Sequence, residues 1–372
     1  MKKEFTTDKI TFVHSKDELG YQAVLDDIPF ATEVTIVTFN ISEKKSELID
    51  ALYSVRENCT INIVTNIPGR WEEYYKESVR NKAHKKIEVY MSKLNPEKLG
   101  NNSAVFFDFS NHGKIIMTNN IVYVGSANFS EESANNTEFG FISRDSNFIE
   151  YIRSQVLPDM IKSSIPYYEE NTELLLEATM AISAVYNMRS ELHESAYYVN
   201  DEFNVVCYYY KENEAFLTIQ LLNRIELVIE EAMRVAEKIY NVILTAINDG
   251  VADEDDMMDI GNFHDELVSM YEYICAILSW DTLQELAGFD VERDILQRLE
   301  YEYGMEAYDE NLENCMKDAE GSAVDVINRL AGEAREDVEI LLSELDKFVK
   351  RHSEFTGKLR GIKKKNSQID NT

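Results

Sequence analysis

The chain has 372 residues, of which 44% are hydrophobic, and its formal net charge is −31. This length and apolar content allow more than one buried core, and no apolar stretch is long enough to span a bilayer. The charge is uneven: residues 1–165 hold 19 Lys and Arg against 23 Asp and Glu, whereas residues 166–372 hold 18 against 45. The second part should therefore repel nucleic acid and anionic membranes, while the first can approach a polyanion.

The first residues and the cysteines both favour a cytoplasmic protein. The opening MKKEF leads into mixed polar sequence instead of the apolar core of a signal peptide. The cysteines lie far apart and never form Cys-x-x-Cys, so we expect reduced, mostly buried thiols and no zinc site. They are Cys59, Cys207, Cys275 and Cys315. The acidic run at residues 253–256 lacks the glycine of an EF-hand loop, and we expect a solvated loop and no metal there.

Residues 1–165 alternate short β-type runs with amphipathic stretches. The expected strands are rich in Val, Ile, Thr and Phe and cover residues 10–14, 33–39, 61–65, 87–91 and 104–109. The expected helices lie near residues 17–26, 43–56 and 71–84, with Ser42 as the N-cap of the second. Such alternation predicts an α/β domain over residues 1–165, with a mixed, largely parallel sheet flanked by helices.

After residue 165 the pattern changes to long apolar stripes with helical spacing. The stripes consist of Leu222, Ile225, Ile229, Ala232, Ala236, Ile239, Ile243 and Ala246, and of Ile327, Ala331, Ala334, Val338, Leu341, Leu345 and Phe348. We expect an acidic all-α bundle over residues 166–356 that serves dimerisation, regulation or partner docking. Residues 197–210 fit either a hairpin or a helical turn region. Residues 357–372 are expected to form a basic, disordered tail.

The segment NHGKIIMTNNIVYVGSANFS, residues 111–130, predicts a β-hairpin. Two apolar runs, residues 113–118 and 121–124, flank Asn119-Asn120, and asparagine tolerates the positive φ of a tight turn. Side chains two positions apart share a face of a strand. An imidazole and an ammonium before the hairpin, and a hydroxyl and a carboxamide after it, should therefore converge.

These four groups, from His112, Lys114, Ser126 and Asn128, suit a phosphoryl group. A neutral imidazole can attack phosphorus and hold it covalently. A lysine neutralises non-bridging oxygens, and hydroxyl and amide donors stabilise charge that grows in the transition state. The imidazole also needs an acceptor that orients it, and Glu138, at the start of the next apolar run, could reach back.

The combined pattern resembles the signature of the phospholipase D superfamily. It consists of His112-x-Lys114, Gly125-Ser126-x-Asn128 and Asn136-x-Glu138. The phrase GSANFS is most similar to small bacterial nuclease and restriction-endonuclease members, and the resemblance covers roughly residues 5–150. His14-Ser15-Lys16 repeats the His-x-Lys spacing, but no Gly-Ser-x-Asn follows it, so we interpret it as chance.

The resemblance implies metal-independent and cofactor-independent cleavage of a phosphodiester. His112 would be the nucleophile that forms a phosphohistidine, and a second histidine would act as general acid and then activate water. Lys114 and Asn128 would bind phosphate, Ser126 would assist, and Glu138 would orient His112. Because the chain has one copy of the motif, the site would require a homodimer, or a higher oligomer, with two His112 residues facing each other.

Three further motif positions, Asn119, Gly125 and Asn136, are expected to be structural. The family usually has an aspartate where this chain has Asn119, and the interval to Gly125 is one residue shorter than usual. In the family that aspartate is mainly structural, near the hairpin turn, so an asparagine that keeps one acceptor can suffice. A degenerate domain that binds without cutting remains the alternative.

We therefore expect a nuclease acting on DNA or RNA, or else a degenerate nucleic-acid-binding or regulatory subunit of a larger complex. Bacterial relatives of this domain act in anti-phage defence, sometimes with an ATPase partner, which makes such a role an expectation here. A lipid phosphodiesterase ranks lower, because the acidic half would resist an anionic interface. A basic cluster, Arg80, Lys82, Lys85 and Lys86, could contact a nucleic-acid backbone, although a solvated helix end is the commoner meaning.

Overall fold

The computed structural model describes residues 3–6, 9–53, 55–56, 58–68, 76–100, 102–167, 171–202, 205–249, 254–303 and 312–359. These residues divide into two compact units. The first ends at Glu177 and most of the second begins at Ala178, so the division falls inside helix α7 (Thr172–Ala196). The domain limits expected from the sequence, residues 1–165, 166–356 and 357–372, stay predictions.

The first unit is built on a mixed sheet. In the described part of the chain its strands are β1 (Lys3–Thr6), β2 (Ile10–Ser15), β3 (Glu33–Thr38), β4 (Thr60–Thr65), β5 (Ser103–Phe107), β6 (Ile115–Thr118), β7 (Val122–Gly125), β8 (Glu138–Ser143) and β9 (Ile165–Pro166). Their order is β1-β2-β8-β7-β6-β3-β4-β5-β9. Among the described pairs only β3–β4 and β4–β5 are parallel.

The expected mixed α/β sheet is confirmed, but the expectation that it is largely parallel is wrong. Strands β6 and β7 are antiparallel because a tight hairpin joins them, and β7 and β8 also pair antiparallel, across the longer connection of residues 126–137. Strand β2 then pairs antiparallel with β8, at the side of the sheet away from the parallel strands. The hairpin expected around Asn119-Asn120 is present, with Met117 opposite Val122.

Three local expectations in this unit differ from the structure. Residues 87–91 lie in helix α3 (Glu77–Lys93), whose buried residues Ala83, Ile87 and Tyr90 follow helical spacing, although the run also alternates like a strand. Ser42 is not an N-cap, because α2 (Glu47–Tyr53) begins later and the Ser42 hydroxyl binds the carboxylate of Glu131. The helix expected near residues 17–26 is reduced to α1 (Gln22–Leu25).

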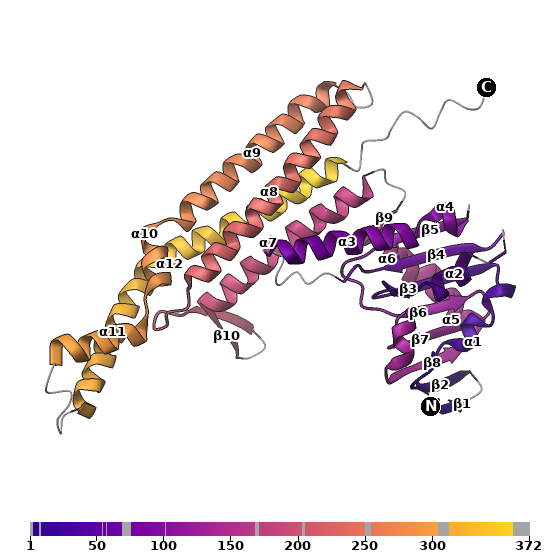
Figure 1. The fold of residues 1–372 in the computed structure, drawn as a ribbon, viewed down its shortest axis with the longest axis horizontal. Helices are drawn as coiled ribbons and strands as arrows, with labels where there is room; N and C mark the ends of the chain where they lie inside the picture. The colour runs from indigo at the N-terminus through magenta and orange to yellow at the C-terminus, as the bar shows by residue number, and fades with distance from the viewer. Residues whose placement is uncertain are drawn as a thin grey trace. The chain divides into compact units, whose positions relative to one another are not determined.

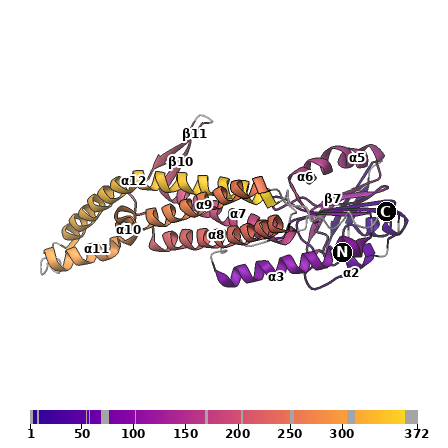
Figure 2. The same cartoon turned by 90° about the horizontal axis from the view of Figure 1, so that it is seen from above.

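Helices cover both faces of the sheet, α2 and α3 on one side and α5 and α6 on the other (Figure 2). The remaining short elements of this unit are η1 (Ile28–Phe30), α4 (Pro96–Leu99), η3 (Glu131–Asn135), α5 (Ser146–Tyr151), the π-helical turn η4 (Ile152–Val156) and α6 (Leu157–Ser163). Ile149 and Ile152 pack on Met117 and Val122 of the hairpin. The covering helices thus hold the strands that carry the motif.

The second unit is a helical bundle, as expected. Long helices α8 (Ile219–Asn248), α9 (Glu254–Leu278) and α12 (Leu312–Leu359) run side by side (Figure 1), with α10 (Asp281–Gly288), α11 (Val291–Arg298) and η5 (Leu299–Tyr303) between α9 and α12. Both predicted stripes are buried, apart from the half-buried Ala246. The unit is not purely α-helical, because the ambiguous segment forms a hairpin of β10 (Tyr197–Glu202) and β11 (Val205–Tyr210).

Several smaller expectations concern this unit. The acidic run is helical from Glu254 onward instead of a loop, and residue 253 lies outside the described residues. Helix α12 continues to Leu359, and the rest of the expected tail lies outside the described residues. All four cysteines are free thiols, with Cys59 and Cys315 buried. No helix in the described part of the chain combines the length and the apolar character needed to cross a bilayer.

A buried imidazole joins α12 to α8. The His352 ring is 0% exposed, its Nε2 lies 2.8 Å from the carbonyl oxygen of Ala232, and its Nδ1 lies 3.2 Å from Oγ1 of Thr356. Burial lowers the pKa of His352, although the Ala232 carbonyl acts in the opposite direction. The folded state therefore favours the neutral ring.

This burial predicts a pH-dependent stability. Below about pH 6.5 the unfolded chain binds a proton that folded His352 resists, so the free energy of unfolding should fall by up to about 1.4 kcal/mol per pH unit from this group. His352→Gln keeps a donor for the Ala232 carbonyl and should lack this component. Urea unfolding of both proteins at about pH 7.5 and about pH 5.5 measures it. Equal losses in the two proteins would contradict the assignment.

Candidate active site

The ends of several strands meet at one edge of the sheet in the first unit. Thr38 ends β3 opposite Thr65 of β4, which in turn lies opposite Phe107 of β5. At the same edge β6 begins beside the end of β3, with Ile115 opposite Val37. Strand β7 ends there and β8 begins there, because they run antiparallel to their neighbours. The predicted catalytic residues therefore adjoin three of these strands, β6, β7 and β8, at a common edge.

His112 and Lys114 lie side by side just before β6. The Nζ of Lys114 is 3.1 Å from Nδ1 of His112, and both side chains contact the ring of Phe39, at 4.8 Å between ring centroids and 5.4 Å from Nζ to the centroid. His112 is exposed, whereas Lys114 is 8% exposed. Burial lowers the pKa of Lys114, and the charge of Glu138 acts in the opposite direction. An accessible imidazole thus sits beside a partly desolvated amine.

Thr38 holds both halves of the motif. Its carbonyl accepts a hydrogen bond from Nδ2 of Asn111 at 2.8 Å, directly before His112. Its hydroxyl accepts from the backbone N–H of Phe129 at 2.9 Å, directly after Asn128. Thr38 is 0% exposed, so neither bond competes with water. The buried end of β3 therefore fixes the two segments relative to each other.

Asn128 is fixed by its own side chain. Its Oδ1 accepts from the backbone N–H of Phe39 at 3.2 Å, and its carbonyl accepts from the hydroxyl of Tyr21 at 3.0 Å. Because Oδ1 takes the backbone donor, the amide orientation is set by this bond. The donor nitrogen Nδ2 is then the part of the amide that a phosphate oxygen can use.

Glu138 does not make the expected contact with His112 within one chain. Its carboxylate accepts hydrogen bonds from Oγ of Ser126 and, at 3.4 Å, from Nδ2 of Asn136. Ser126 is itself held by Phe139, whose N–H donates to the Ser126 oxygen at 3.0 Å. Glu138 is 7% exposed, so its direct partners decide its position. In the single chain this carboxylate positions Ser126, and the Nδ1 of His112 faces Lys114 instead.

Gly125 is required by close packing. A Cβ atom at Gly125 would lie 2.3 Å from the Tyr123 hydroxyl and 2.4 Å from the carbonyl oxygen of Phe139. One at Gly140 would lie 2.4 Å from the Tyr123 ring. The tyrosine thus crosses both glycines, and burial raises the pKa of Tyr123 to about 12. The glycine of the Gly-Ser motif therefore leaves the space that the Tyr123 side chain occupies next to the site.

Asn119 lies at the other end of β6 from His112. Its Oδ1 accepts from the backbone N–H groups of Thr32 at 2.8 Å and Glu33 at 3.3 Å. These are the groups where β3 begins, so the side chain joins the hairpin turn to that strand. An aspartate at this position would offer the same acceptor. The departure from the family pattern therefore falls on a structural contact away from the reacting groups.

The basic cluster lies on α3, and Lys86 is held by structural contacts. Its Nζ donates to the carbonyl of Pro68 at 3.1 Å and pairs with Glu43 at 3.0 Å. Lys82 and Lys85 are exposed, and Arg80 is half-buried. Nothing in these contacts joins the cluster to His112, and its role in nucleic-acid binding stays a prediction.

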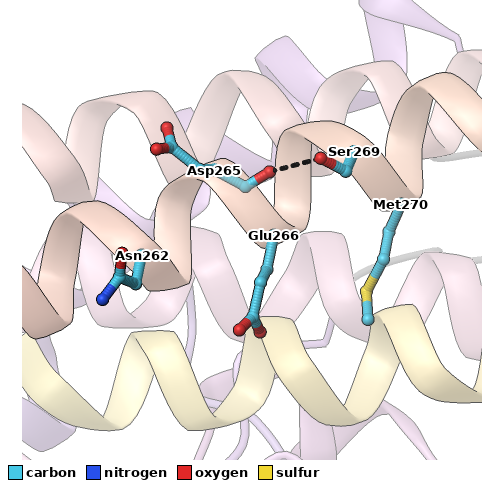
Figure 3. Close-up of a pocket in the computed structure, with 5 residues that line it drawn as sticks. All are labelled: Asn262, Asp265, Glu266, Ser269 and Met270. Atoms are coloured by element: carbon cyan, nitrogen blue, oxygen red, sulfur yellow. Dashed lines mark hydrogen bonds between the residues drawn. The ribbon is translucent and has the colours of Figure 1, made fainter.

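A second concave site lies on α9. Figure 3 shows an open pocket whose lining residues all come from this one helix: Asn262, Asp265, Glu266, Ser269 and Met270. Ser269 donates to the carbonyl of Asp265 at 2.9 Å, and Glu266 pairs with Arg351. The pocket lacks the converging groups from several elements that characterise the sheet edge. Within the described residues no group of three metal-ligating side chains occurs.

Comparison with known proteins supports the motif. Residues 30–159 match the family model described as "Cardiolipin synthase, PLD-like domain". This segment is phospholipase D-like. The superfamily resemblance expected from the motif is thereby confirmed over these residues. No match was found among curated proteins.

Solved structures are similar only distantly. Nuc from Salmonella typhimurium, described as a phospholipase D family member, is 16% identical, with a TM-score of 0.33, over 42% of this chain and 97% of its own. NucT from Helicobacter pylori is 19% identical, with a TM-score of 0.29, over 41% and 98%. Phosphatidylserine synthase from Haemophilus influenzae Rd KW20 is 14% identical, with a TM-score of 0.28, over 47% and 46%. Similarities with such low identities and TM-scores carry no argument about function, which must rest on the geometry of the site.

Sequence reasoning missed the residues that hold the site together, chiefly Thr38, Phe39 and Asn111. A usable signal exists for the first two, because they end a predicted strand of a parallel pair, and such ends line sites. Asn111 is adjacent to His112 and bonds back to the backbone N–H of Gly113 at 2.8 Å. No spacing in the sequence indicates that Thr38 accepts from both segments.

The contacts of Asn119 predict which substitutions it tolerates. Asn119→Asp keeps the acceptor for Thr32 and Glu33 and should leave the free energy of unfolding nearly unchanged. Asn119→Ala leaves these N–H groups without their acceptor and should cost about 1–2 kcal/mol. Urea denaturation of the three proteins measures the difference. If Asn119→Asp proved as destabilised as Asn119→Ala, the acceptor would not be the reason for an amide at this position.

Proposed function

We propose that the first unit is a metal-independent phosphodiesterase of the nuclease type that acts on DNA or RNA as a homodimer. The observation that supports this most is the exposed His112 beside the buried Lys114, at an edge shared with Ser126 and Asn128. The phospholipase D-like match over residues 30–159 supports phosphodiester chemistry at the family level. The two-step reaction and the dimer are our proposals.

The reaction would proceed in two balanced steps. In the first, a nitrogen of His112 attacks phosphorus, the bond from phosphorus to the leaving oxygen breaks, and that oxygen takes a proton from the partner subunit's His112. In the second, the partner's His112 removes a proton from water, the water oxygen attacks phosphorus, and the phosphorus–nitrogen bond breaks. Lys114 and the amide of Asn128 would stabilise the charge on the non-bridging oxygens.

The contact between His112 and Lys114 bears on the dimer. For Nε2 to attack, Nδ1 must carry the ring proton and donate it to an acceptor, a role that an ammonium group cannot fill. In one chain the nearby carboxylate, Glu138, is bound to Ser126 and Asn136. A carboxylate can accept further hydrogen bonds beyond those from Ser126 and Asn136, and we infer that His112 donates to Glu138 of the partner subunit across the two-fold axis. The expected orienting role of Glu138 would then operate between subunits.

Charge favours nucleic acid approaching the first unit. Residues 1–165 are close to neutral with a net −4, whereas the remainder carries −27. An acidic surface repels a polyanion unless cations offset it, so the second unit fits a structural, regulatory or docking role better than substrate binding. We also propose an anti-phage role and an ATPase partner, and the only support for them is the resemblance of the motif to that of bacterial relatives.

A degenerate binding or regulatory module is the second candidate. The acidic helical unit favours it, because that unit could dock a partner. The departure from the family pattern at Asn119 also favours a degenerate module. The position of Asn119 at the hairpin turn, away from the reacting groups, weakens that argument. Saturable binding of nucleic acid with no turnover across DNA and RNA substrates would support this candidate over an enzyme.

Cleavage in a chelator tests the proposed activity. Wild-type protein should cut single-stranded DNA or RNA in excess EDTA, and His112→Ala should lose at least about 100-fold in rate. His84→Ala removes another imidazole of the same unit, one that pairs with Glu177 on α7, and should retain the activity. Thermal melts of each variant control for folding.

Two outcomes would contradict the proposal. One is activity that EDTA abolishes or that His112→Ala retains. The other is full activity from a species that sedimentation velocity shows to be a monomer, because one chain supplies only one motif histidine. Nucleic-acid binding without cleavage by a folded dimer would instead support the regulatory alternative.

A further inference from the structure

An exposed aromatic strip lies on strands β2 and β8 of the first unit. Phe12 is 45% exposed and Phe139 is 50% exposed, and their ring centroids are 6.4 Å apart with planes inclined by 27°. The His14 ring stacks on Phe139 at 4.8 Å with planes inclined by 12°. Three nearly parallel rings therefore stand next to one another. We call Phe12, His14 and Phe139 the aromatic strip.

The register of the strands places these rings on one face of the sheet. His14 pairs with Phe139, and Phe12 pairs with Phe141, across the β2–β8 ladder. Cross-strand partners and alternate positions share a face. The intervening Val13 points to the opposite face, where it is 1% exposed. The exposure of the strip is thus not the result of a frayed strand, because Val13 and Ser15 of β2 are buried on the opposite face.

The helices that cover this face stop short of the strip. Phe148 of α5 packs against Phe141 at 5.8 Å between ring centroids, and Ile149 and Ile152 pack on the β6–β7 hairpin. Beyond Phe141 the strip remains open, together with Ile10, which is 44% exposed. Large apolar side chains that stay exposed next to a covered face mark an interaction surface.

The strip borders the candidate active site through direct backbone bonds. The N–H of Phe139 donates to Oγ of Ser126 at 3.0 Å, and the N–H of Ser126 donates to the carbonyl of Phe139 at 2.8 Å. Glu138, which holds Ser126, is the residue before Phe139. A polymeric ligand with a phosphate bound near Ser126 would therefore reach the strip within a few of its units.

We propose that the aromatic strip stacks the bases of a single-stranded nucleic acid whose phosphate is bound at the His112 edge. The location relative to a scissile phosphate rests on the proposed function, whereas the stacking itself does not. Aromatic rings on a sheet bind unpaired bases through their π faces regardless of sequence. In a duplex the base faces are already stacked, so the strip should select single strands.

Cations at the ends of the strands suit this occupant better than a second copy of the chain. Exposed Lys9 and Lys16 flank β2, and exposed Arg144 follows β8. Lys9 pairs with Asp145 at 3.6 Å while 79% of its side chain stays exposed. Lys and Arg beside aromatic rings are typical of single-strand binding, whereas Lys is depleted in the core of protein–protein interfaces. The His14-x-Lys16 pair then belongs to this surface and not to a second catalytic motif.

Fluorescence anisotropy with a labelled oligothymidylate tests the proposal on the full chain, with every protein compared, the one with the unchanged strip included, carrying His112→Ala so that the probe is not cleaved. The double variant Phe12→Ala/Phe139→Leu should weaken binding by about 10-fold or more, because stacking contributes strongly per base. Duplex DNA should bind equally to the variant and to the protein with the unchanged strip. Phe30→Ala is the matched control, since Phe30 is 66% exposed on η1 and lies outside the strip. This control should bind oligothymidylate like the protein with the unchanged strip.

Three results would overturn the proposal. They are the absence of oligothymidylate binding by the protein with the unchanged strip up to about 100 µM, an effect of the double variant no larger than that of Phe30→Ala, and conversion of a dimer to a monomer by Phe12→Ala in sedimentation velocity. The last result would make the strip an interface between copies of the chain.

Hydrolysis of bis(p-nitrophenyl) phosphate separates this proposal from the proposed function. This small diester has no nucleobase to stack, so Phe12→Ala should leave its turnover unchanged. If oligothymidylate binds through the strip but the wild type does not hydrolyse the diester, the proposed enzymatic activity is refuted and the role of the strip is supported. If the wild type hydrolyses the diester but substitution of Phe12 and Phe139 leaves oligothymidylate binding unchanged, the role of the strip is refuted and the enzymatic activity is supported.

Discussion

The candidate site depends on the hydrogen bonds made at the buried end of β3. Thr38 accepts from Asn111 through its carbonyl and from Phe129 through its hydroxyl, and these two donors flank the two halves of the motif. Both bonds lie in a dry environment, where an unpaired N–H would cost more than in water. The β6–β7 hairpin brings the segment with His112 close to the loop with Asn128, and the bonds to Thr38 fix both segments to the end of β3. With them, four phosphate-directed groups share one edge of the sheet.

The side chains that suit a phosphoryl group could be predicted from their spacing in the sequence. The contacts that hold them in place could not. Two apolar runs and the Asn119-Asn120 turn between them predicted the hairpin, because both are local features of the sequence. The partner of Glu138 could not be predicted, since the carboxylate reaches Ser126 or His112 according to tertiary packing. The same limit applies to the sheet, whose parallel part is confined to β3, β4 and β5. Residues 87–91 fit both the strand and the helix period, and burial of Ile87 on the helical face decided the outcome.

The two units differ in the properties that bear on the proposed nuclease function. The first places a partly desolvated lysine beside an exposed imidazole, and its exposed aromatic strip is the surface for which we propose stacking of unpaired bases. The second buries two long apolar stripes and holds most of the chain's acidic excess, which disfavours a polyanion, and docking or dimerisation is the role that we propose for it. A single motif histidine per chain makes assembly a chemical requirement of the two-step reaction.

The covalent step is the claim on which the rest depends. The most direct test is to quench wild-type protein in alkali during turnover of a nucleic-acid substrate and to map the modified residue by mass spectrometry. The account predicts a phosphoramidate on His112, formed in EDTA and hydrolysed on further incubation before the quench. An adduct on a different residue, or cleavage that proceeds while His112 stays unmodified at every time point, would contradict it.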